Sequence, residues 1–294
     1  MKVLVTGVGG QLGFDVVNEL LKRNICVIGS DILPSSSTKC EYRRLDFTDA
    51  ESVESLMTEV KPDVVIHCGG WTAVDAAEDN IDKVFKINHI GTENIAKICA
   101  KLNCKMMFIS TDYVFNGEGQ QPWDPDKSKP SPLNIYGLSK VKAESSVKEI
   151  VEKYFIVRIS WAFGINGNNF VKTMINLGKK YSEIRVINDQ IGTPTYTFDL
   201  AKLLVDIVLT DKYGVYHATN SGGFISWYDF ACEIFRQAGY NTKVVPVTTL
   251  EYGGNKAKRP LNSRLDKSKL VMNGFTLLPD WKNALQRYLS LLIK

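Results

Sequence analysis

The sequence predicts an α/β fold: a doubly wound, Rossmann-type parallel sheet with a smaller C-terminal lobe. Between residues 2 and 160, short apolar runs bounded by turn residues alternate with stretches of helical period. Helices that separate buried strands require a parallel sheet covered on both faces. The first apolar run leads into the glycine-rich segment TGVGGQLG at residues 6–13, which is typical of the first strand-to-helix turn of such a sheet. Beyond residue 160 the alternation weakens, which indicates a separate lobe.

The expected elements of the first half follow this alternation in order. Turn residues and one candidate N-cap, Asp49, separate the runs. We expect strands over 2–6, 25–30, 41–45, 63–68, 105–110 and 155–160, and helices over 12–23, 50–60 and 80–102. Four prolines between residues 116 and 134 predict a surface loop, which leads into a further helix that carries Tyr136 and Lys140.

The second half has too few apolar runs for an equally long series of strands. We expect helices over 169–180, 198–210, 226–238 and 280–292, a strand over 214–219 and a loop at 188–194. Residues 1–160 would form the Rossmann domain, with 186–220 returning to it. Residues 161–185 and 221–294 would form the smaller lobe.

Composition and charge are those of an ordinary globular protein. The 294 residues are 44% hydrophobic, which allows a substantial core. The net charge of +4 is spread along the chain without a run of about five or six like charges, so we expect no nucleic-acid partner. No stretch reaches the roughly 18 apolar residues of a membrane span, and the N-terminus leads directly into the first strand. We therefore expect a cytoplasmic protein without a membrane partner.

The cysteines do not indicate a metal site. The six cysteines include no Cys-x-x-Cys pair, and the chain has three histidines, so a zinc site has few ligands to draw on. We interpret the cysteines as reduced, mostly buried thiols. Cys68 lies beside the expected ligand cleft, where a reactive role is conceivable, but the apolar run before it favours strand packing.

The glycines of the first turn predict a dinucleotide site. Gly7 would provide the tight turn, Gly10 the close backbone approach to a pyrophosphate, and Gly13 the close packing of helix on strand. The step from Gly7 to Gly10 is one residue longer than in the dehydrogenase fingerprint, although Gly9 makes the match ambiguous. An ordinary tight turn is the alternative interpretation.

Asp31 ends the second strand, where a carboxylate can accept hydrogen bonds from both adenine-ribose hydroxyls. A carboxylate there would also repel a 2′-phosphate, which favours NADH over NADPH modestly. Lys39, Arg43 or Arg44 could still reach a phosphate if the 33–40 loop folds inward. The alternative is that Asp31 caps the turn before Pro34.

Tyr136 and Lys140 stand one helical turn apart, so the phenol and the ammonium share one face. The ammonium should lower the tyrosine pKa from about 10, which suits an acid for carbonyl reduction. Thr111, at the end of a strand, could hydrogen-bond the substrate carbonyl and complete a Thr/Tyr/Lys triad. The alternatives are a packed tyrosine ring with a solvated lysine, and a threonine that only forms a turn.

Asn88 interrupts an otherwise apolar helix. A buried amide there should hold either backbone groups or a water relay to Lys140. We interpret the neighbouring His89 as a packed or surface imidazole rather than a ligand or base.

These motifs resemble the extended short-chain dehydrogenase/reductase superfamily, through Thr6-Gly7-x-x-Gly10-x-x-Gly13 and Tyr136-x-x-x-Lys140. Within it, the chain resembles the dTDP-4-dehydrorhamnose reductase family from end to end. The segments that carry the resemblance are TAVDAAE (72–78), STDYVF (110–115), DQIGTP (189–194), KRPLNS (258–263) and LPDW (278–281). Dehydratases of the superfamily typically have two acidic residues after the strand-end threonine, whereas Tyr113 takes the second place here.

The resemblance implies NAD(P)H-dependent reduction of the C4 ketone of dTDP-4-dehydro-β-L-rhamnose, with the smaller lobe binding the substrate. It implies that the catalytic residues are Thr111, Tyr136 and Lys140. It implies a sugar pocket of Val74, Asp112, Tyr113 and Trp161, with Arg259 and Asn262 near the diphosphate. It implies dinucleotide contacts from Gly7, Gly10, Gln11, Leu12, Gly13, Asp31, Asp46, Phe47, Cys68, Gly69, Gly70, Tyr136 and Lys140. The family more often has two alanines where Gly69 and Gly70 stand.

Two other functions stay open at this point. The chain could reduce a related nucleotide-linked 4-keto sugar. It could also be a non-catalytic dinucleotide-binding subunit, because the regulatory β subunit of methionine adenosyltransferase resembles the same family. Some family members bind Mg²⁺ at a dimer contact through glutamates, so Mg²⁺ stays a possible ligand, but its ligand residues are not mapped onto this chain. We therefore assign no metal site and treat a homodimer as an open possibility.

Overall fold

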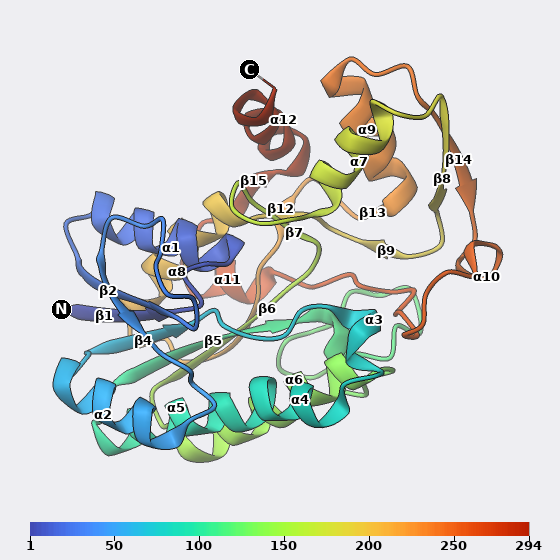
Figure 1. Ribbon diagram of the computed structural model, residues 1–294. Helices are drawn as coiled ribbons and strands as arrows, with labels where there is room; N and C mark the ends of the chain where they lie inside the picture. The colour runs from blue at the N-terminus through green and yellow to red at the C-terminus, as the bar shows by residue number, and fades with distance from the viewer. Residues whose placement is uncertain (294) are drawn as a thin grey trace.

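The computed structural model describes residues 1–293, and its centre is a seven-stranded, wholly parallel sheet (Figure 1). The strand order is β11-β6-β5-β4-β1-β2-β3. The strands are β1 (Lys2–Thr6), β2 (Cys26–Asp31), β3 (Glu41–Arg44), β4 (Val64–His67), β5 (Lys105–Thr111), β6 (Tyr154–Ile159) and β11 (Gly214–His217). The predicted doubly wound fold is therefore confirmed.

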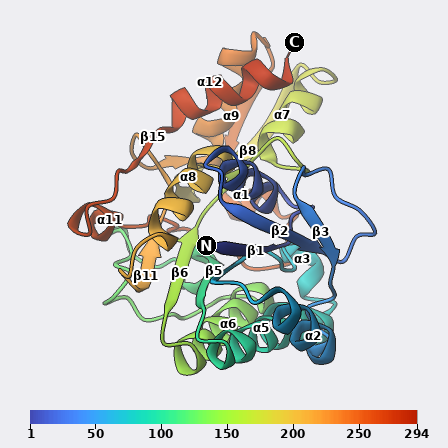
Figure 2. The same cartoon turned by 90° about the vertical axis from the view of Figure 1, so that its left-hand side faces the viewer.

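Helices cover both faces of this sheet (Figure 2). Successive residues of a strand point to opposite faces, so Val3 and Val5 of β1 enter one core and Leu4 enters the other. The first core lies under α1 (Gln11–Lys22) and α8 (Thr197–Val208), and the second under α2 (Ala50–Val60), α5 (Gly91–Lys101) and α6 (Ile135–Ile150). Helix α2 begins at Asp49, whose side chain accepts a hydrogen bond from the Glu51 amide, as predicted.

A third core forms the smaller lobe, which stands apart from the sheet in Figure 1. Its helices are α7 (Phe170–Gly178), α9 (Trp227–Ala238) and α12 (Trp281–Leu292). A two-stranded parallel sheet of β8 (Glu183–Ile187) and β14 (Lys243–Val247) flanks them. The sequence prediction missed this pair of strands because β14 contains Pro246, which is typical of a loop but is tolerated where a strand has a neighbour on one side only.

Further short elements complete the fold. They are α3 (Val74–Ala77), β7 (Ala162–Phe163), β9 (Ile191–Gly192), β10 (Thr195–Tyr196), β12 (Asn220–Ser221), β13 (Ile225–Ser226), α10 (Thr249–Tyr252), α11 (Ser268–Met272) and β15 (Leu278–Asp280). Within residues 1–293, no helix is both long enough and apolar enough to cross a membrane.

The single helix predicted over 80–102 is wrong in its middle. The structure has α4 (Ile81–Phe85), then a π-helical turn at Lys86–Ile90, then α5. A π-turn inserts one residue into the helix and is frequent at functional sites. Asn88 lies at the centre of this turn.

Two sets of hydrogen bonds tie the lobe to the Rossmann domain. The Arg287 guanidinium on α12 donates to both oxygens of Asp199 on α8, at 2.9 and 2.5 Å. The Gln11 Oε1 atom accepts hydrogen bonds from the Gly164 amide at 2.8 Å and from Asn169 Nδ2 at 2.9 Å. These contacts hold the lobe beside the glycine-rich turn.

Candidate active site

The start of α6 packs tightly against the end of β5. Asn134 caps α6 by accepting a 2.8 Å hydrogen bond from the Gly137 amide. A Cβ atom on Gly137 would lie 2.2 Å from the Tyr113 carbonyl oxygen, so only glycine permits this approach. The rings of Tyr113 and Tyr136 consequently meet edge to face, with centroids 5.8 Å apart. The predicted convergence of the β5 end with Tyr136 is present in the structure.

The Tyr136 hydroxyl is held in its protonated form. Burial raises the pKa of Tyr136 to about 12, hydrogen bonding with the Thr111 side chain acts in the opposite direction, and the charge of Asp112 raises the pKa further. The expectation that Lys140 lowers this pKa is therefore wrong for the protein alone. The reason is that the free-energy cost of removing a phenolate from water exceeds the stabilisation that the surrounding groups give it.

Lys140 lies under the site, with 6% of its surface exposed. Its Nζ atom donates a 2.7 Å hydrogen bond to the Ile109 carbonyl and lies 4.0 Å from the centre of the Phe108 ring. Burial lowers the pKa of Lys140 to about 7, opposed chiefly by the negative charge of Glu144. Lys140 is thus a buried ammonium that can lose its proton near neutral pH.

Thr111 and Asp112 form a hydrogen-bonded pair beside Tyr136. Thr111 Oγ1 donates to Asp112 Oδ1 at 3.0 Å and accepts from the Tyr113 amide at 3.2 Å. Asp112 is 2% exposed, and its Oδ2 atom has no hydrogen-bond partner within residues 1–293. Burial raises the pKa of Asp112 to about 6 against hydrogen bonds from Ser263 and Thr111. A buried, unsatisfied carboxylate oxygen is costly and suits a ligand hydroxyl.

The Asn88 side chain forms hydrogen bonds with the backbone, which is one of the two roles predicted for it. Its Oδ1 atom accepts a 2.7 Å hydrogen bond from the Trp71 amide, and its Nδ2 atom donates to the Trp71 carbonyl at 3.2 Å and to Ser139 Oγ at 2.9 Å. Asn88 therefore fixes the segment after β4 against α6. His89 is a packed imidazole whose Nε2 atom lies 3.1 Å from Ser146 Oγ.

The glycine-rich turn has the geometry that a dinucleotide requires. Gly7 has a φ of +74°, and a Cβ atom on Gly13 would lie 2.3 Å from the Gly7 carbonyl oxygen. Leu12 is buried beneath this turn. Helix α1 begins at Gly10 with no side-chain cap among the described residues and no acidic residue in its first turn. Its amide groups are therefore available to a pyrophosphate.

Asp31 lies beside this turn and caps it. Its Oδ2 atom accepts a 2.9 Å hydrogen bond from the Gly9 amide, and its Oδ1 atom accepts one of 3.3 Å from the Leu33 amide. Arg44 lies next to it, with Nε 3.1 Å from the Ile32 carbonyl oxygen. In the protein alone, Asp31 thus has the turn-capping role that was the alternative prediction.

The segment after β4 lies against Phe47, whose ring meets His67 edge to face at 5.0 Å. A Cβ atom on Gly69 would lie 2.6 Å from that ring, and one on Gly70 would lie 3.0 Å from Asn88 Oδ1. Both glycines are therefore closely packed, and a methyl group at either position would require its neighbour to shift.

Two other predicted cofactor residues flank this segment. Burial raises the pKa of the Cys68 thiol to about 12, which favours a packing role over a reactive one. Asp46 is exposed and accepts hydrogen bonds from the Thr48 amide and hydroxyl at 2.9 and 2.8 Å.

The predicted sugar-side residues come from both parts of the chain. Val74 begins α3, and the next residue, Asp75, accepts a 2.5 Å hydrogen bond from Arg259 Nη2. Arg259 Nε is buried without a hydrogen-bond partner in the part of the chain that the structure describes. Trp161 stacks on Trp227 with ring centroids 3.8 Å apart. Sequence reasoning missed Trp227, because nothing in the local pattern indicates its partner.

The Asn262 side chain is buried and binds protein backbone, which differs from the ligand contact predicted for it. It is 1% exposed, and its Nδ2 atom donates to the carbonyls of Glu118 and Gln121 at 3.3 and 2.9 Å. Its Oδ1 atom accepts hydrogen bonds from the Arg264 amide and guanidinium. Asn262 therefore fixes the loop after β5 to the segment that carries Arg259.

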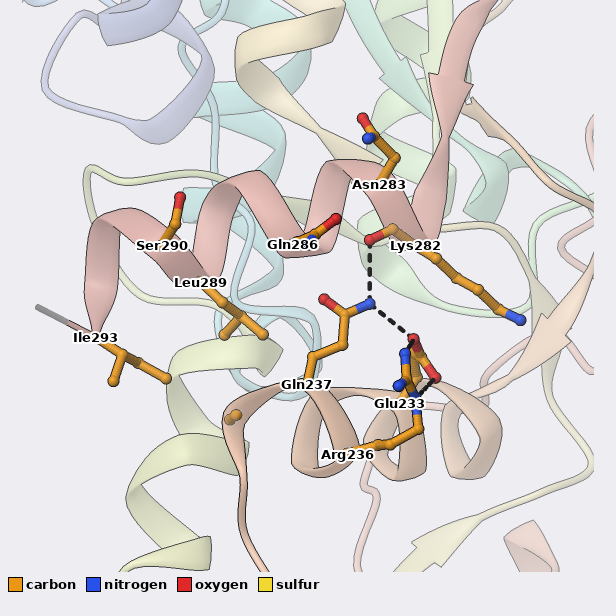
Figure 3. A pocket seen from close by; sticks show the side chains of 10 residues that line it. Glu233, Arg236, Gln237, Lys282, Asn283, Gln286, Leu289, Ser290 and Ile293 are labelled. Atoms are coloured by element: carbon orange, nitrogen blue, oxygen red, sulfur yellow. Dashed lines mark hydrogen bonds and ion pairs between the residues drawn. The ribbon is translucent and has the colours of Figure 1, made fainter.

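A separate hollow of about 660 Å³ lies between α9 and α12 (Figure 3). Gln237 crosses it, donating to Glu233 Oε1 at 2.7 Å and to the Lys282 carbonyl at 3.1 Å. It shares no lining residue with the site around Tyr136.

Comparisons with known proteins identify the family. The family model described as the RmlD substrate binding domain matches residues 1–293. The spore coat polysaccharide biosynthesis protein SpsK of Bacillus subtilis is 38% identical over 98% of this chain and 97% of its own length. The dTDP-4-dehydrorhamnose reductase of Escherichia coli is 35% identical over 99% of this chain and 97% of its own.

Solved structures give the same result. The dTDP-4-dehydrorhamnose reductase of Clostridium acetobutylicum is 41% identical, with a TM-score of 0.93 over 100% of both chains. That of Bacillus anthracis, in complex with NADP, is 41% identical, with a TM-score of 0.91 over 98% of both chains. Because the family model and these relatives cover nearly the whole chain, it belongs to the dTDP-4-dehydrorhamnose reductase family.

Proposed function

We propose that this chain is an NAD(P)H-dependent oxidoreductase that converts dTDP-4-dehydro-β-L-rhamnose to dTDP-β-L-rhamnose by reducing the C4 ketone. The observation that carries the proposal is the meeting of Thr111, Tyr136 and Lys140 at the end of β5, beside an uncapped glycine-rich turn. The family relatives named as reductases of this sugar support the choice of substrate.

Tyr136 is the proton donor in this proposal. Its raised pKa keeps the hydroxyl protonated at neutral pH, so a proton is available to the alkoxide that develops at C4. Thr111 orients that oxygen, and the Lys140 ammonium stabilises the phenolate left on Tyr136. The reduced nicotinamide, when bound, supplies the hydride.

The dinucleotide would lie along the glycine-rich turn with its pyrophosphate at the start of α1. Gly7, Gly10, Gln11, Leu12 and Gly13 would hold the pyrophosphate end through the backbone. Asp31 would turn from the Gly9 amide toward the adenine ribose, which favours NADH. Arg44 beside it would still admit the 2′-phosphate, consistent with the NADP complex of the Bacillus anthracis relative. Asp46, Phe47, Cys68, Gly69 and Gly70 would line the other side.

The nucleotide sugar would lie between the β5 end and the lobe. Asp112 Oδ2 would accept a hydrogen bond from a sugar hydroxyl, and Val74, Tyr113 and Trp161 would surround the ring. The unpartnered Nε of Arg259 would reach the diphosphate, where a guanidinium fork suits phosphate oxygens. Asn262 would support Arg259 through the loop that it fixes.

A direct assay tests the proposal. The purified protein is mixed with dTDP-4-dehydrorhamnose generated in place, and the loss of absorbance by reduced nicotinamide is followed with NADH and NADPH in turn. We expect consumption with both cofactors. Replacing Tyr136→Phe should lower turnover by roughly 10²- to 10⁴-fold with cofactor binding little changed. Unchanged turnover in this variant would remove Tyr136 from the mechanism, and absence of consumption by the wild type would overturn the proposed reaction.

A further inference from the structure

Helix α6 carries a buried ionisable side chain, Glu144, one turn beyond Lys140. Tyr136, Lys140 and Glu144 follow one another at four-residue steps, which keeps them near one face of the helix. Glu144 is 1% exposed, although a buried carboxylate costs considerable free energy. The proposed reaction does not use Glu144 directly, so its place under the site requires another explanation.

Arg158 on β6 holds the Glu144 carboxylate from the sheet side. Its Nε atom donates to Glu144 Oε1 at 2.8 Å, and its Nη2 atom donates to Oε2 at 2.6 Å. Arg158 is itself 1% exposed. A buried ion pair often gives no more stability than apolar side chains of the same volume, so the pair is not explained by folding alone.

The pair belongs to a polar row that crosses three strands just before their carboxyl ends. Arg158 is in register with Ser110 on β5 and with His217 on β11. Ser110 precedes Thr111, and its hydroxyl helps to lower the pKa of Glu144 after the dominant hydrogen bond from Arg158, against the effect of burial. Through Arg158, the row therefore connects α6 to β6, which lies beside the strand that ends at Thr111.

Glu144 is the acidic group that acts on the Lys140 ammonium. Facing Lys140 are the Ile109 carbonyl and Phe108 ring on β5, and His67 and Cys68 at the end of β4. Among the described residues, no carboxylate lies within salt-bridge distance of Lys140. Burial favours the uncharged amine, and the charge of Glu144 opposes this effect, whereas the Cys68 thiol is uncharged at neutral pH.

Two cations and one hydroxyl face Glu144 itself. Arg158 forms the two short hydrogen bonds, and Lys148 on the next turn of α6 lies 3.7 Å from Oε2. The Ser110 hydroxyl also favours the ionised carboxylate, although Ser110 Oγ forms no hydrogen bond among the described residues. These groups keep Glu144 ionised, so its negative charge is a fixed feature of the buried helix face.

We propose that Glu144 and Arg158 are positioning residues for Lys140: Arg158 fixes the Glu144 carboxylate and anchors α6 to β6, and Glu144 keeps Lys140 cationic beneath Tyr136. This inference rests on the proposed reductase function for its kinetic consequence. The predicted effect of Glu144 on the charge of Lys140 can be tested without measuring turnover.

The Glu144→Gln variant tests the proposal because the amide keeps the shape and a hydrogen bond to Arg158 but loses the charge. Glu149→Gln is the matched control, since Glu149 is an exposed glutamate on the same helix. We expect the high-pH limb of the kcat/KM profile to move to lower pH by about half a unit or more in Glu144→Gln. We expect no movement in Glu149→Gln.

The charge of Lys140 is read independently by ¹³C NMR of protein labelled at lysine Cε, with the Lys140 signal assigned by its loss in Lys140→Met. Titration of this signal at lower pH in Glu144→Gln supports the proposal even if the wild type reduces no dTDP sugar, which would overturn the proposed function alone. Identical Lys140 titrations in wild type and Glu144→Gln would overturn the proposal. If Glu144→Gln does not fold, Glu144→Gln with Arg158→Gln removes both buried charges and is judged by the same titration.

Discussion

Trp161 stacks on Trp227 at 3.8 Å although the Trp161 backbone has a φ of +49°, a conformation that tryptophan rarely adopts. A non-glycine residue in this region costs on the order of 1–3 kcal/mol and persists only where its surroundings fix it. Here the other fixed neighbour is Gly192, where a Cβ atom would lie 3.0 Å from the Trp161 ring. The strain points to a function for the ring itself, consistent with a wall of the proposed sugar pocket.

The Trp161→Ala substitution should weaken substrate binding and leave the Kd of the dinucleotide unchanged. We expect KM for the nucleotide sugar to rise roughly 3- to 10-fold, because one aromatic contact contributes about 0.5–1.5 kcal/mol. The measurements are steady-state KM and the Kd of the dinucleotide from titration. Trp227→Phe, which retains an aromatic ring beneath Trp161, is the control and should change KM less. An unchanged KM in Trp161→Ala would contradict this role.

Asp112→Asn should make the protein more stable and less active at pH 8. The folded-state pKa of Asp112 is about 6, above its usual value of 3.8, so folding binds a proton between these values. Below about pH 3.8 the carboxyl carries no penalty, and as the pH rises through 6 folding must bury the charge. The neutral amide avoids this cost, so Tm should rise by a few degrees at pH 8, and the gain should vanish near pH 4.

Thermal melts of wild type and variant at both pH values check this prediction, and turnover is measured on the same samples. A Tm gain of equal size at pH 4 and pH 8 would show that charge burial is not the cause.

Gly13→Ala should impair folding, whereas Gly10→Ala should impair cofactor binding. A Cβ atom at Gly13 would lie 2.3 Å from the Gly7 carbonyl oxygen, a backbone atom that cannot move away, so Gly13→Ala should lose several degrees of Tm or fail to fold. A Cβ atom at Gly10 meets the same oxygen at 3.3 Å, so Gly10→Ala should fold. If Gly10 permits the approach of a pyrophosphate, its Kd for NADPH should rise about 10-fold or more. Melting curves and cofactor titration separate the two effects.

Arg259→Lys should raise KM for the nucleotide sugar roughly 10-fold with little change in Tm. Lysine keeps the charge but loses the planar fork, and with it the Nε donor that is now unpartnered among the described residues. Lys256→Ala is the control, because Lys256 is an exposed cation of the same segment as Arg259 and pairs with Asp79. Equal effects of the two substitutions on KM would indicate general electrostatic attraction instead.

The Rossmann domain could be predicted because its signals are local. The apolar run of β1, the glycines after it and the Asp49 cap each lie within a few residues of the element they define. The pairing of β8 with β14 could not be predicted, because the strands are far apart in sequence and β14 contains Pro246, a residue typical of loops. The π-turn around Asn88 also escaped, since an inserted residue leaves the apolar pattern nearly unchanged.

The arrangement of Tyr136 and Lys140 could be predicted from the sequence, but their electrostatics could not. The spacing of Tyr136 and Lys140 predicts a shared helix face, and the structure brings both to the β5 end. Spacing says nothing of burial, however, and burial sets both of their pKa values. The direction of the Gln11 and Asn262 amides likewise depends on loops remote in the chain, so sequence alone could not show that they bind protein backbone.

The pairing of Arg287 with Asp199 has a consequence for how the chain matures. Arg287 and Tyr288 lie on α12, the last helix, and Tyr288 donates a 2.8 Å hydrogen bond to the Gly164 carbonyl beside the glycine-rich turn. Without α12, the Asp199 carboxylate would lack this cation and the lobe core would be open to solvent. Chains that lack α12 should therefore be substrates for chaperones and proteases rather than partly active catalysts.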